Sequence, residues 1–194
     1  GNGIKTRWKG LDQEVDDALG IIGFNNYKGF LKSGKYKDIL SFVDKDLRMI
    51  LSPSFNYDKI EEGISTPTPE EAARYFCSQL LSGDKTTDNI QGLPNFSPEF
   101  QQKYNTGKTR GIGKATANSL LEGKSIKEMF SLVIEAYKSY YGEEKKEFVS
   151  FRNETFNWNW LDFLKENAVL LWMRREEGEL YNIEDTFKRL KLEY

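Results

Sequence analysis

The chain has 194 residues, of which 30% are charged and 14% aromatic, and its formal net charge is −2. This length accommodates one domain of ordinary size with an apolar core, and the aromatic content excludes a disordered chain. Histidine is absent, which excludes Ser-His-Asp and Cys-His nucleophile systems and His-ligated zinc sites. Any catalysis must therefore use carboxylates, lysines, tyrosines or a bound metal.

Cysteine usage and hydropathy set further bounds. Cys77 is the only cysteine, which excludes an internal disulfide, and its place among apolar residues predicts a buried structural thiol. No apolar run reaches the ~18–20 residues that cross a bilayer. The first ten residues lack the apolar region of a signal peptide. We therefore expect a cytoplasmic protein with no membrane partner.

Three elements are predicted in the first half of the chain. Helical periodicity predicts a helix over residues 11–24. Residues 38–44 form a short β-branched and aromatic run, whose length fits a buried strand better than a helix. A further helix is predicted over residues 69–82, because Thr68 and Glu71 have the spacing of a capping box and apolar residues follow at helical intervals.

The second half reads as one loop and three helices. Residues 95–110 are polar and punctuated by Gly and Pro, which predicts a loop. Helical periodicity then predicts helices over 114–121, 126–141 and 155–172. The aromatic side chains of the last segment are expected to pack in the core, and a docking face for a partner protein is the alternative.

Three acidic clusters lie at or next to these predicted elements. One lies in the first helix, one at the end of the predicted strand, and one directly after the second helix. Each has a structural alternative: a solvated first turn, a strand-ending turn and a capped turn. The seven residues are Glu14, Asp16, Asp17, Asp44, Asp46, Asp84 and Asp88.

Carboxylates that converge on one site repel each other strongly unless a cation is bound. Hard divalent cations with oxygen ligands relieve that repulsion, so we expect Mg²⁺, with Mn²⁺ able to substitute. If the second helix continued past Gly83, Asp84 and Asp88 would share one face of it.

A glycine turn precedes the helix predicted over 114–121. The Gly111-Ile112-Gly113 turn leads into the helix N-terminus, where backbone N–H groups favour a phosphate. Lys114 adds a direct charge. Other basic residues nearby extend a positive rim, namely Lys103, Lys108, Arg110 and Lys124.

Taken in order, these motifs resemble those of the 5′ nuclease family, which comprises flap endonucleases, the 5′–3′ exonuclease domains of bacterial DNA polymerases, and phage exonucleases. That family has E-x-D-D on a helix, D-K-D at a strand end, then G-D-x-x-D-N-(I/L)-x-G and G-I-G-x-K-T-A. The resemblance covers roughly residues 12–122. The matching segments are 14–17, 44–46, 83–92 and 111–117.

The resemblance implies an α/β, predominantly helical fold. Its parts are a partial 5′-nuclease (PIN-like) core with few strands in residues 1–90, a helix–three-turn–helix DNA-binding region in 91–150, and an aromatic helical tail in 151–194. The amino-terminal region of the family is missing from this sequence. We therefore expect the carboxy-terminal part of a longer nuclease, which binds DNA weakly and cleaves it poorly.

The resemblance also implies roles for individual residues. Two Mg²⁺ ions would be held by Glu14 and Asp16 and, mainly for the second ion, by Asp44, Asp46 and Asp84, with Asp17 and Asp88 in support. The catalytic set would be Asp16, Asp44, Asp46 and Asp84. The glycine hairpin would bind duplex DNA backbone, with a K⁺ ion on its carbonyl groups. Its DNA-binding residues would be Gly111, Ile112, Gly113, Lys114, Thr116, Lys108 and Arg110.

Three departures from the family pattern concern spacing. Asp84 and Asp88 are one residue further apart than in the family, and a long insertion separates Pro94 from Gly111. Also, Gly113 is followed directly by Lys114, where the family has one intervening residue.

The predicted function is a 5′–3′ exonuclease or flap endonuclease that hydrolyses DNA by a two-metal mechanism. The expected partners are duplex or branched DNA with a 5′ end and replication proteins, for a monomer in a bacterial or phage-infected cell. The alternatives are a non-catalytic DNA-binding module and a metal-dependent RNase.

Overall fold

The computed structural model describes residues 15–43, 45–84, 90–107, 111–150 and 152–194. This part of the chain is mixed α/β with few strands, as predicted, and it is about half helical. None of the helices described there is long and apolar enough to span a membrane. The elements are α1 (Val15–Ser33), β1 (Leu40–Phe42), η1 (Lys45–Met49), β2 (Ser54–Asn56), η2 (Ile60–Glu62), β3 (Ile64–Ser65), α2 (Pro69–Ser82), α3 (Pro98–Tyr104), α4 (Lys114–Leu121), α5 (Ile126–Tyr141), β4 (Lys146–Val149), β5 (Thr155–Trp158), α6 (Trp160–Leu171) and α7 (Ile183–Leu190).

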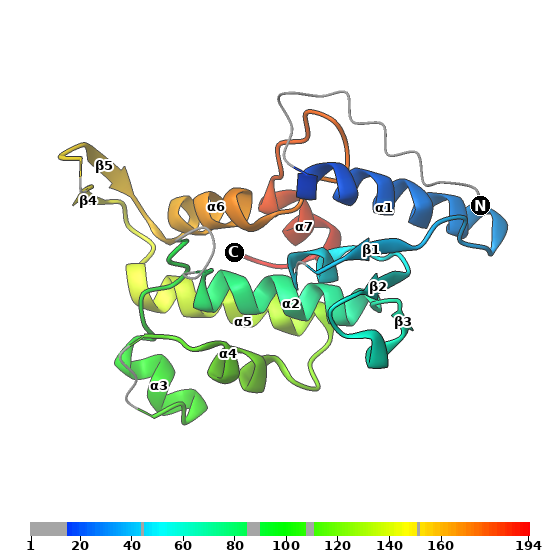
Figure 1. Ribbon diagram of the computed structural model, residues 1–194. Coiled ribbons are helices and arrows are strands. Elements are labelled where there is room, and N and C mark those ends of the chain that lie inside the picture. Colours follow the sequence, from blue (N-terminus) through cyan, green and yellow to red (C-terminus); the bar gives the residue numbers. More distant parts are fainter. Residues whose placement is uncertain (1–14, 44, 85–89, 108–110, 151) are drawn as a thin grey trace.

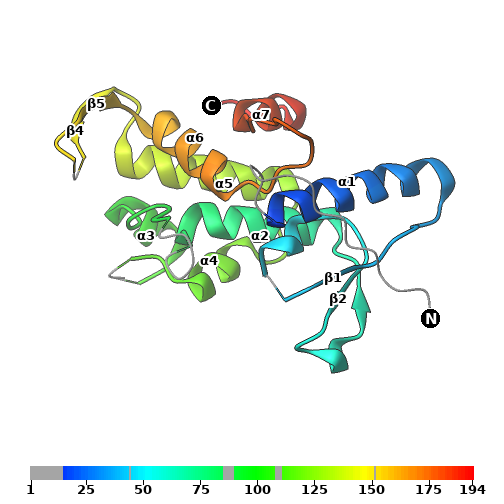
Figure 2. The same ribbon diagram turned by 45° about the horizontal axis from the view of Figure 1, so that its top comes forward.

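Helix α2 is the centre of the molecule. The predicted capping box is present, because the Thr68 side chain accepts from the Glu71 N–H and the Glu71 carboxylate accepts from the Thr68 N–H. The apolar stripe of α2, which includes Phe76 and Leu80, is fully buried. Helices α4, α5 and α6 pack against it, with α4 and α5 alongside in both views (Figure 1; Figure 2). The predicted buried thiol is confirmed, since Cys77 on this stripe has no exposed surface.

A small sheet lies at one end of α2 (Figure 1). Strand β1 pairs in parallel with β2, and β3 adds antiparallel to β2. The strand predicted within residues 38–44 is thus confirmed as β1, whereas the sequence did not indicate β2 or β3, which have only three and two residues. Buried Asn26 of α1 ties the sheet to that helix, because its Nδ2 donates to the Asp38 carbonyl (2.8 Å) and to Ser52 Oγ (2.7 Å).

Helix α1 is longer than predicted. It extends to Ser33, beyond the predicted end at residue 24, because Asn26 has hydrogen-bond partners inside the fold instead of breaking the helix. The next residue, Gly34, has a φ of +70°, and its N–H donates to the Phe30 carbonyl (2.7 Å). A glycine in this left-handed region is a common way to end a helix.

Two sequence predictions were wrong. The segment 95–110, predicted as a loop or a short insertion, contains helix α3. The side chain of Ser97 caps this helix by accepting from the Phe100 N–H, and the Phe100 side chain is buried. The helix predicted over 155–172 starts at Trp160, because the preceding residues form strand β5 and pair with β4. Exposed and half-buried residues alternate along β5, as expected for a strand. The half-buried Phe156 packs against Trp158, which packs against Phe163 of α6.

The hydrophobic core is continuous from the sheet to the C-terminal helix and includes Leu40, Phe76, Phe130 and Phe187. Core packing of the aromatic tail is confirmed for Trp160, which is 4% exposed. The expected segments 1–90, 91–150 and 151–194 all contribute residues to this one core.

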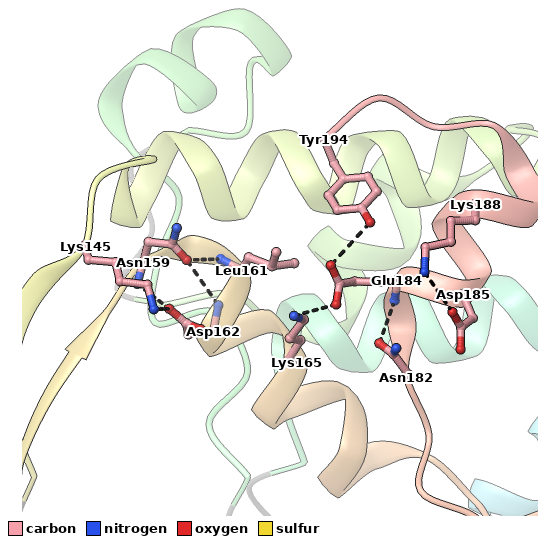
Figure 3. A network of polar contacts seen from close by, with 10 residues as sticks. All are labelled: Lys145, Asn159, Leu161, Asp162, Lys165, Asn182, Glu184, Asp185, Lys188 and Tyr194. Carbon is pink, nitrogen blue, oxygen red and sulfur yellow. Dashed lines mark hydrogen bonds and ion pairs between the residues drawn. The ribbon is translucent and has the colours of Figure 1, made fainter.

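Polar contacts attach α7 to α6 (Figure 3). Lys165 of α6 forms an ion pair with Glu184 of α7 at 2.5 Å, and the Tyr194 hydroxyl donates to the same carboxylate at 3.3 Å. At the start of α6, the Asn159 side chain accepts from two backbone N–H groups, and Asp162 pairs with Lys145 at 3.4 Å. The first contact holds α7 against α6, the second holds the C-terminal residue against α7, and the last two fix the start of α6.

Candidate metal and nucleic-acid site

Asp46 is held by two donors from helix α2. It lies in the first turn of η1, directly after the strand end. The Tyr75 hydroxyl donates to Asp46 Oδ1 at 2.7 Å, and Gln79 Nε2 donates to the same oxygen at 2.8 Å. Tyr75 and Gln79 are four residues apart, so they lie on one face of α2. The helix thereby fixes the carboxylate at its side.

Asp84 has no exposed surface and directly follows the end of α2. The helix stops at Ser82 and Gly83 has a φ of +71°, so α2 does not continue past Gly83. Asp88 lies outside the described residues. The Asp84 carbonyl accepts from the N–H of Ile90 at 2.8 Å. This bond is part of an antiparallel bridge that brings Asp84 and Ile90 side by side.

Gly83 and Gly92, which flank this bridge, lie in close backbone contact. A Cβ atom on Gly92, whose φ is +65°, would come within 2.8 Å of Gly83 Cα and closer still to Gly83 N. The Gly92 carbonyl also accepts from Asn167 Nδ2 (3.4 Å), which donates to the Tyr137 hydroxyl as well (3.0 Å). Tyr137 in turn donates to the Leu80 carbonyl at 2.7 Å. Backbone contact and a buried polar network therefore fix where Asp84 lies.

The negative charges of both carboxylates act on the Tyr75 hydroxyl. Burial raises the pKa of Tyr75 well above its usual range, as do its hydrogen bond to Asp46 and the negative charges of Asp46 and Asp84. The positive charge of Arg48 acts in the opposite direction and lowers this pKa. The hydroxyl therefore stays protonated and remains a donor.

The oxygen donors here fit a hard divalent cation. Asp46 and Asp84 supply carboxylate oxygens, which such ions prefer. The Oε1 atom of Gln79, whose Nε2 binds Asp46, is buried and has no hydrogen-bond partner among the residues that the structure describes. An amide oxygen is also a ligand type for these ions. The fit is to an oxygen-bound ion such as Mg²⁺ or Mn²⁺.

A groove with a volume of about 1000 Å³ runs from Tyr75 to the start of α4. Three basic side chains from three different elements line it: Arg48, Arg74 and Lys114. Three glutamates line it too, of which Glu71 is engaged in the α2 capping box. The groove is therefore lined by both basic and acidic side chains. A polyanion can bind there only to the basic side chains, or to cations that the acidic side chains hold.

The glycine turn directly precedes Lys114, which lines this groove. As predicted, it leads into a helix: Gly113 is the N-cap of α4 and Lys114 is its first residue. Ile112 is buried and anchors the turn, whereas Gly113 and Lys114 are exposed and Thr116 is half-buried. The exposed N-terminus of α4 carries the partial positive charge of the helix dipole.

Only some of the predicted site residues can be placed. The charges of Asp46 and Asp84 act on one hydroxyl, and Lys114 lines the adjacent groove. Asp17 instead contacts the C-terminal segment, where it pairs with Arg174 at 3.4 Å and accepts from its N–H at 3.3 Å. The remaining predictions concern residues or side chains outside the described part of the chain, namely Glu14, Asp16, Asp44, Asp88, Lys108 and Arg110.

Within the described residues, no group of three or more carboxylate or thiol side chains is arranged to hold a metal ion. The pair of Asp46 and Asp84 is therefore the part of the predicted carboxylate site that the structure describes.

Sequence reasoning missed four residues of this site: Arg48, Arg74, Tyr75 and Gln79. Gln79 carried a signal, since it is a polar residue flanked by the apolar stripe of α2 and is only 3% exposed. A buried amide is costly unless it is hydrogen-bonded, so its position predicts a polar partner. Nothing in the sequence indicated that this partner is Asp46.

Comparison with protein-family models, curated proteins and solved structures found no match for this chain.

Proposed function

We propose that this protein is a metal-dependent 5′–3′ exonuclease or flap endonuclease that hydrolyses DNA phosphodiesters. One observation carries the proposal: Tyr75, which lines a groove together with Arg48, Arg74 and Lys114, donates a hydrogen bond to Asp46. The charge of Asp84, a residue far away in the sequence, acts on the same tyrosine hydroxyl. The proposal includes a partial PIN-like core, a helix–three-turn–helix region around the glycine turn, and a cytoplasmic monomer that works with replication proteins.

The roles of the residues follow from their positions. Bound Mg²⁺ would supply an activated water and stabilise the leaving oxygen, and Mn²⁺ could substitute. Asp46 and Asp84 would hold the metal, together with Asp16, Asp44 and the other predicted acidic residues. The fixed orientation of Asp46 and the burial of Asp84 keep these ligands in place before substrate arrives.

The groove would bind the DNA backbone. Arg48, Arg74 and Lys114 can contact successive phosphates, and the N-terminus of α4 favours one more. Contacts of this kind position a nucleic acid without reading its sequence. The proposed K⁺ ion would sit on the carbonyl groups of the glycine turn. The preferred substrate is therefore a duplex or branched DNA with a 5′ end, whatever its sequence.

The test is cleavage of an end-labelled 5′-flap duplex, with matched RNA as a second substrate. Slow cleavage of the DNA is expected in Mg²⁺ or Mn²⁺ and none in EDTA. Asp84→Asn is expected to lower the rate roughly 100-fold or more, because a catalytic metal contributes several kcal/mol to transition-state stabilisation. Glu99→Gln, an exposed carboxylate of α3, is the matched control and should leave the rate unchanged.

Other results would redirect the assignment. Cleavage that survives EDTA or Asp84→Asn would refute the metal mechanism, and preferential cleavage of the RNA would indicate a ribonuclease. The basic side chains of the groove favour one second candidate, a non-catalytic DNA-binding module. Salt-dependent DNA binding without any Mn²⁺ binding or cleavage would support that candidate.

A further inference from the structure

Tyr75 and Gln79 belong to none of the acidic or glycine motifs, yet both donate to one oxygen of Asp46. We propose that these two residues are positioning residues, which fix the orientation of the Asp46 carboxylate so that it can hold a divalent cation. This inference rests on the proposed function, and it adds two residues of α2 to the machinery of that site.

The short helix η1, which contains Asp46, does not by itself fix the orientation of the Asp46 side chain. Helix η1 has five residues and is of the 3₁₀ type, in which hydrogen-bond geometry is poorer than in an α-helix. A carboxylate side chain in such a short element can adopt several rotamers. Its direction must therefore come from the groups that contact it.

Helix α2 is rigid enough to supply that direction. Its start is fixed by the capping box at Thr68 and its end by Gly83. Its buried stripe packs against α4, α5 and α6. Tyr75 is half-buried and Gln79 is almost fully buried, so neither donor is free to leave. Two donors on one rigid helix face define a single position for the Oδ1 atom.

The chemistry of the pair suits a metal ligand. Hydrogen bonds to a charged carboxylate are roughly twice as strong as neutral ones, so they hold the group against rotation. Partners of this kind, bonded to a ligating carboxylate, typically change metal affinity by about 10–100-fold. Because Tyr75 also lines the groove, its hydroxyl orients Asp46 at the edge where substrate would approach.

The test measures Mn²⁺ affinity by EPR, which requires no activity. Tyr75→Phe removes only the hydroxyl and therefore tests the positioning role alone. Gln79→Met replaces the amide with an apolar group of similar size, which removes both its donor to Asp46 and the oxygen that has no partner among the described residues. Each is expected to weaken Mn²⁺ binding about 10-fold or more. Tyr104→Phe is the matched control. Tyr104 of α3 also donates to a carboxylate, that of Glu135 in α5, at 2.8 Å, and this pair lies away from the site. This variant should leave Mn²⁺ affinity unchanged.

The outcomes separate this inference from the proposed function. If wild-type protein binds Mn²⁺ and Asp84→Asn abolishes binding, but Tyr75→Phe and Gln79→Met bind as wild type does, the positioning role is overturned and the metal site stands. Lower stability of these variants at unchanged Mn²⁺ affinity shows a purely structural role and overturns the inference as well. Absence of Mn²⁺ binding by wild-type protein overturns both.

Discussion

The contact between Gly83 and Gly92 predicts a large loss of stability on Gly92→Ala. The φ of Gly92 is +65°, and a non-glycine residue in this region costs about 1–2 kcal/mol. Its new Cβ would also lie 2.8 Å from Gly83 Cα and 3.1 Å from the Leu81 carbonyl oxygen. These are backbone atoms that cannot rotate away, so overpacking adds about 1–3 kcal/mol. The total is about 2–5 kcal/mol.

Gly123→Ala is the matched control for this prediction. Gly123 has a φ of +69°, and no atom lies within 4 Å of the position that a Cβ would take. The control therefore has the conformational cost alone. For a domain of this size ~1 kcal/mol corresponds to roughly 2–4 °C in Tm, so Gly92→Ala should lower Tm by about 4–20 °C and Gly123→Ala by about 2–8 °C.

The assay is urea unfolding followed by circular dichroism, with thermal unfolding as a second measure. The free energy of unfolding of Gly92→Ala should fall below that of Gly123→Ala by the overpacking cost. Equal losses in the two variants would refute the reasoning, because they would show that Gly83 and Gly92 are not in contact.

Three further substitutions test other parts of the structure by urea unfolding. Tyr137→Phe should cost about 1–3 kcal/mol, because it removes the buried donor to the Leu80 carbonyl; wild-type stability would contradict the buried network. Thr68→Ala should cost about 1 kcal/mol through the lost cap of α2, and a neutral effect would show that the cap is dispensable. Asp17→Asn should cost less than about 1 kcal/mol, since its pair with Arg174 is partly exposed. A larger loss would mean that Asp17 has a role beyond this ion pair.

Much of the helical framework could be predicted from the sequence, because it depends on local signals. The capping box at Thr68 and the apolar stripe that follows it define α2 within one segment. Helices α4 and α5 likewise begin and end where the periodicity indicated. Such patterns stabilise the same element in any surroundings, so they can be recognised without knowing the rest of the fold.

The wrong predictions arose where a segment depends on distant partners. The sequence predicts the aromatic residues of β5 to be part of a helix, whereas in the structure Phe156 packs against Trp158 and Trp158 packs against Phe163 of α6. Helix α3 has only seven residues and depends on burial of Phe100. Short elements have little intrinsic stability, so tertiary packing decides what they become.

For the site, the order of the amino acids is enough to identify the acidic and glycine motifs. Only the packed fold shows that Tyr75 and Gln79 of α2 donate to Asp46, and that the charges of Asp46 and Asp84 act on the same tyrosine. It also shows that Asp17 pairs with Arg174. The physical reason is that side-chain chemistry and local periodicity are properties of a short segment. The meeting of two charges from distant segments is a property of the packed core that brings them together.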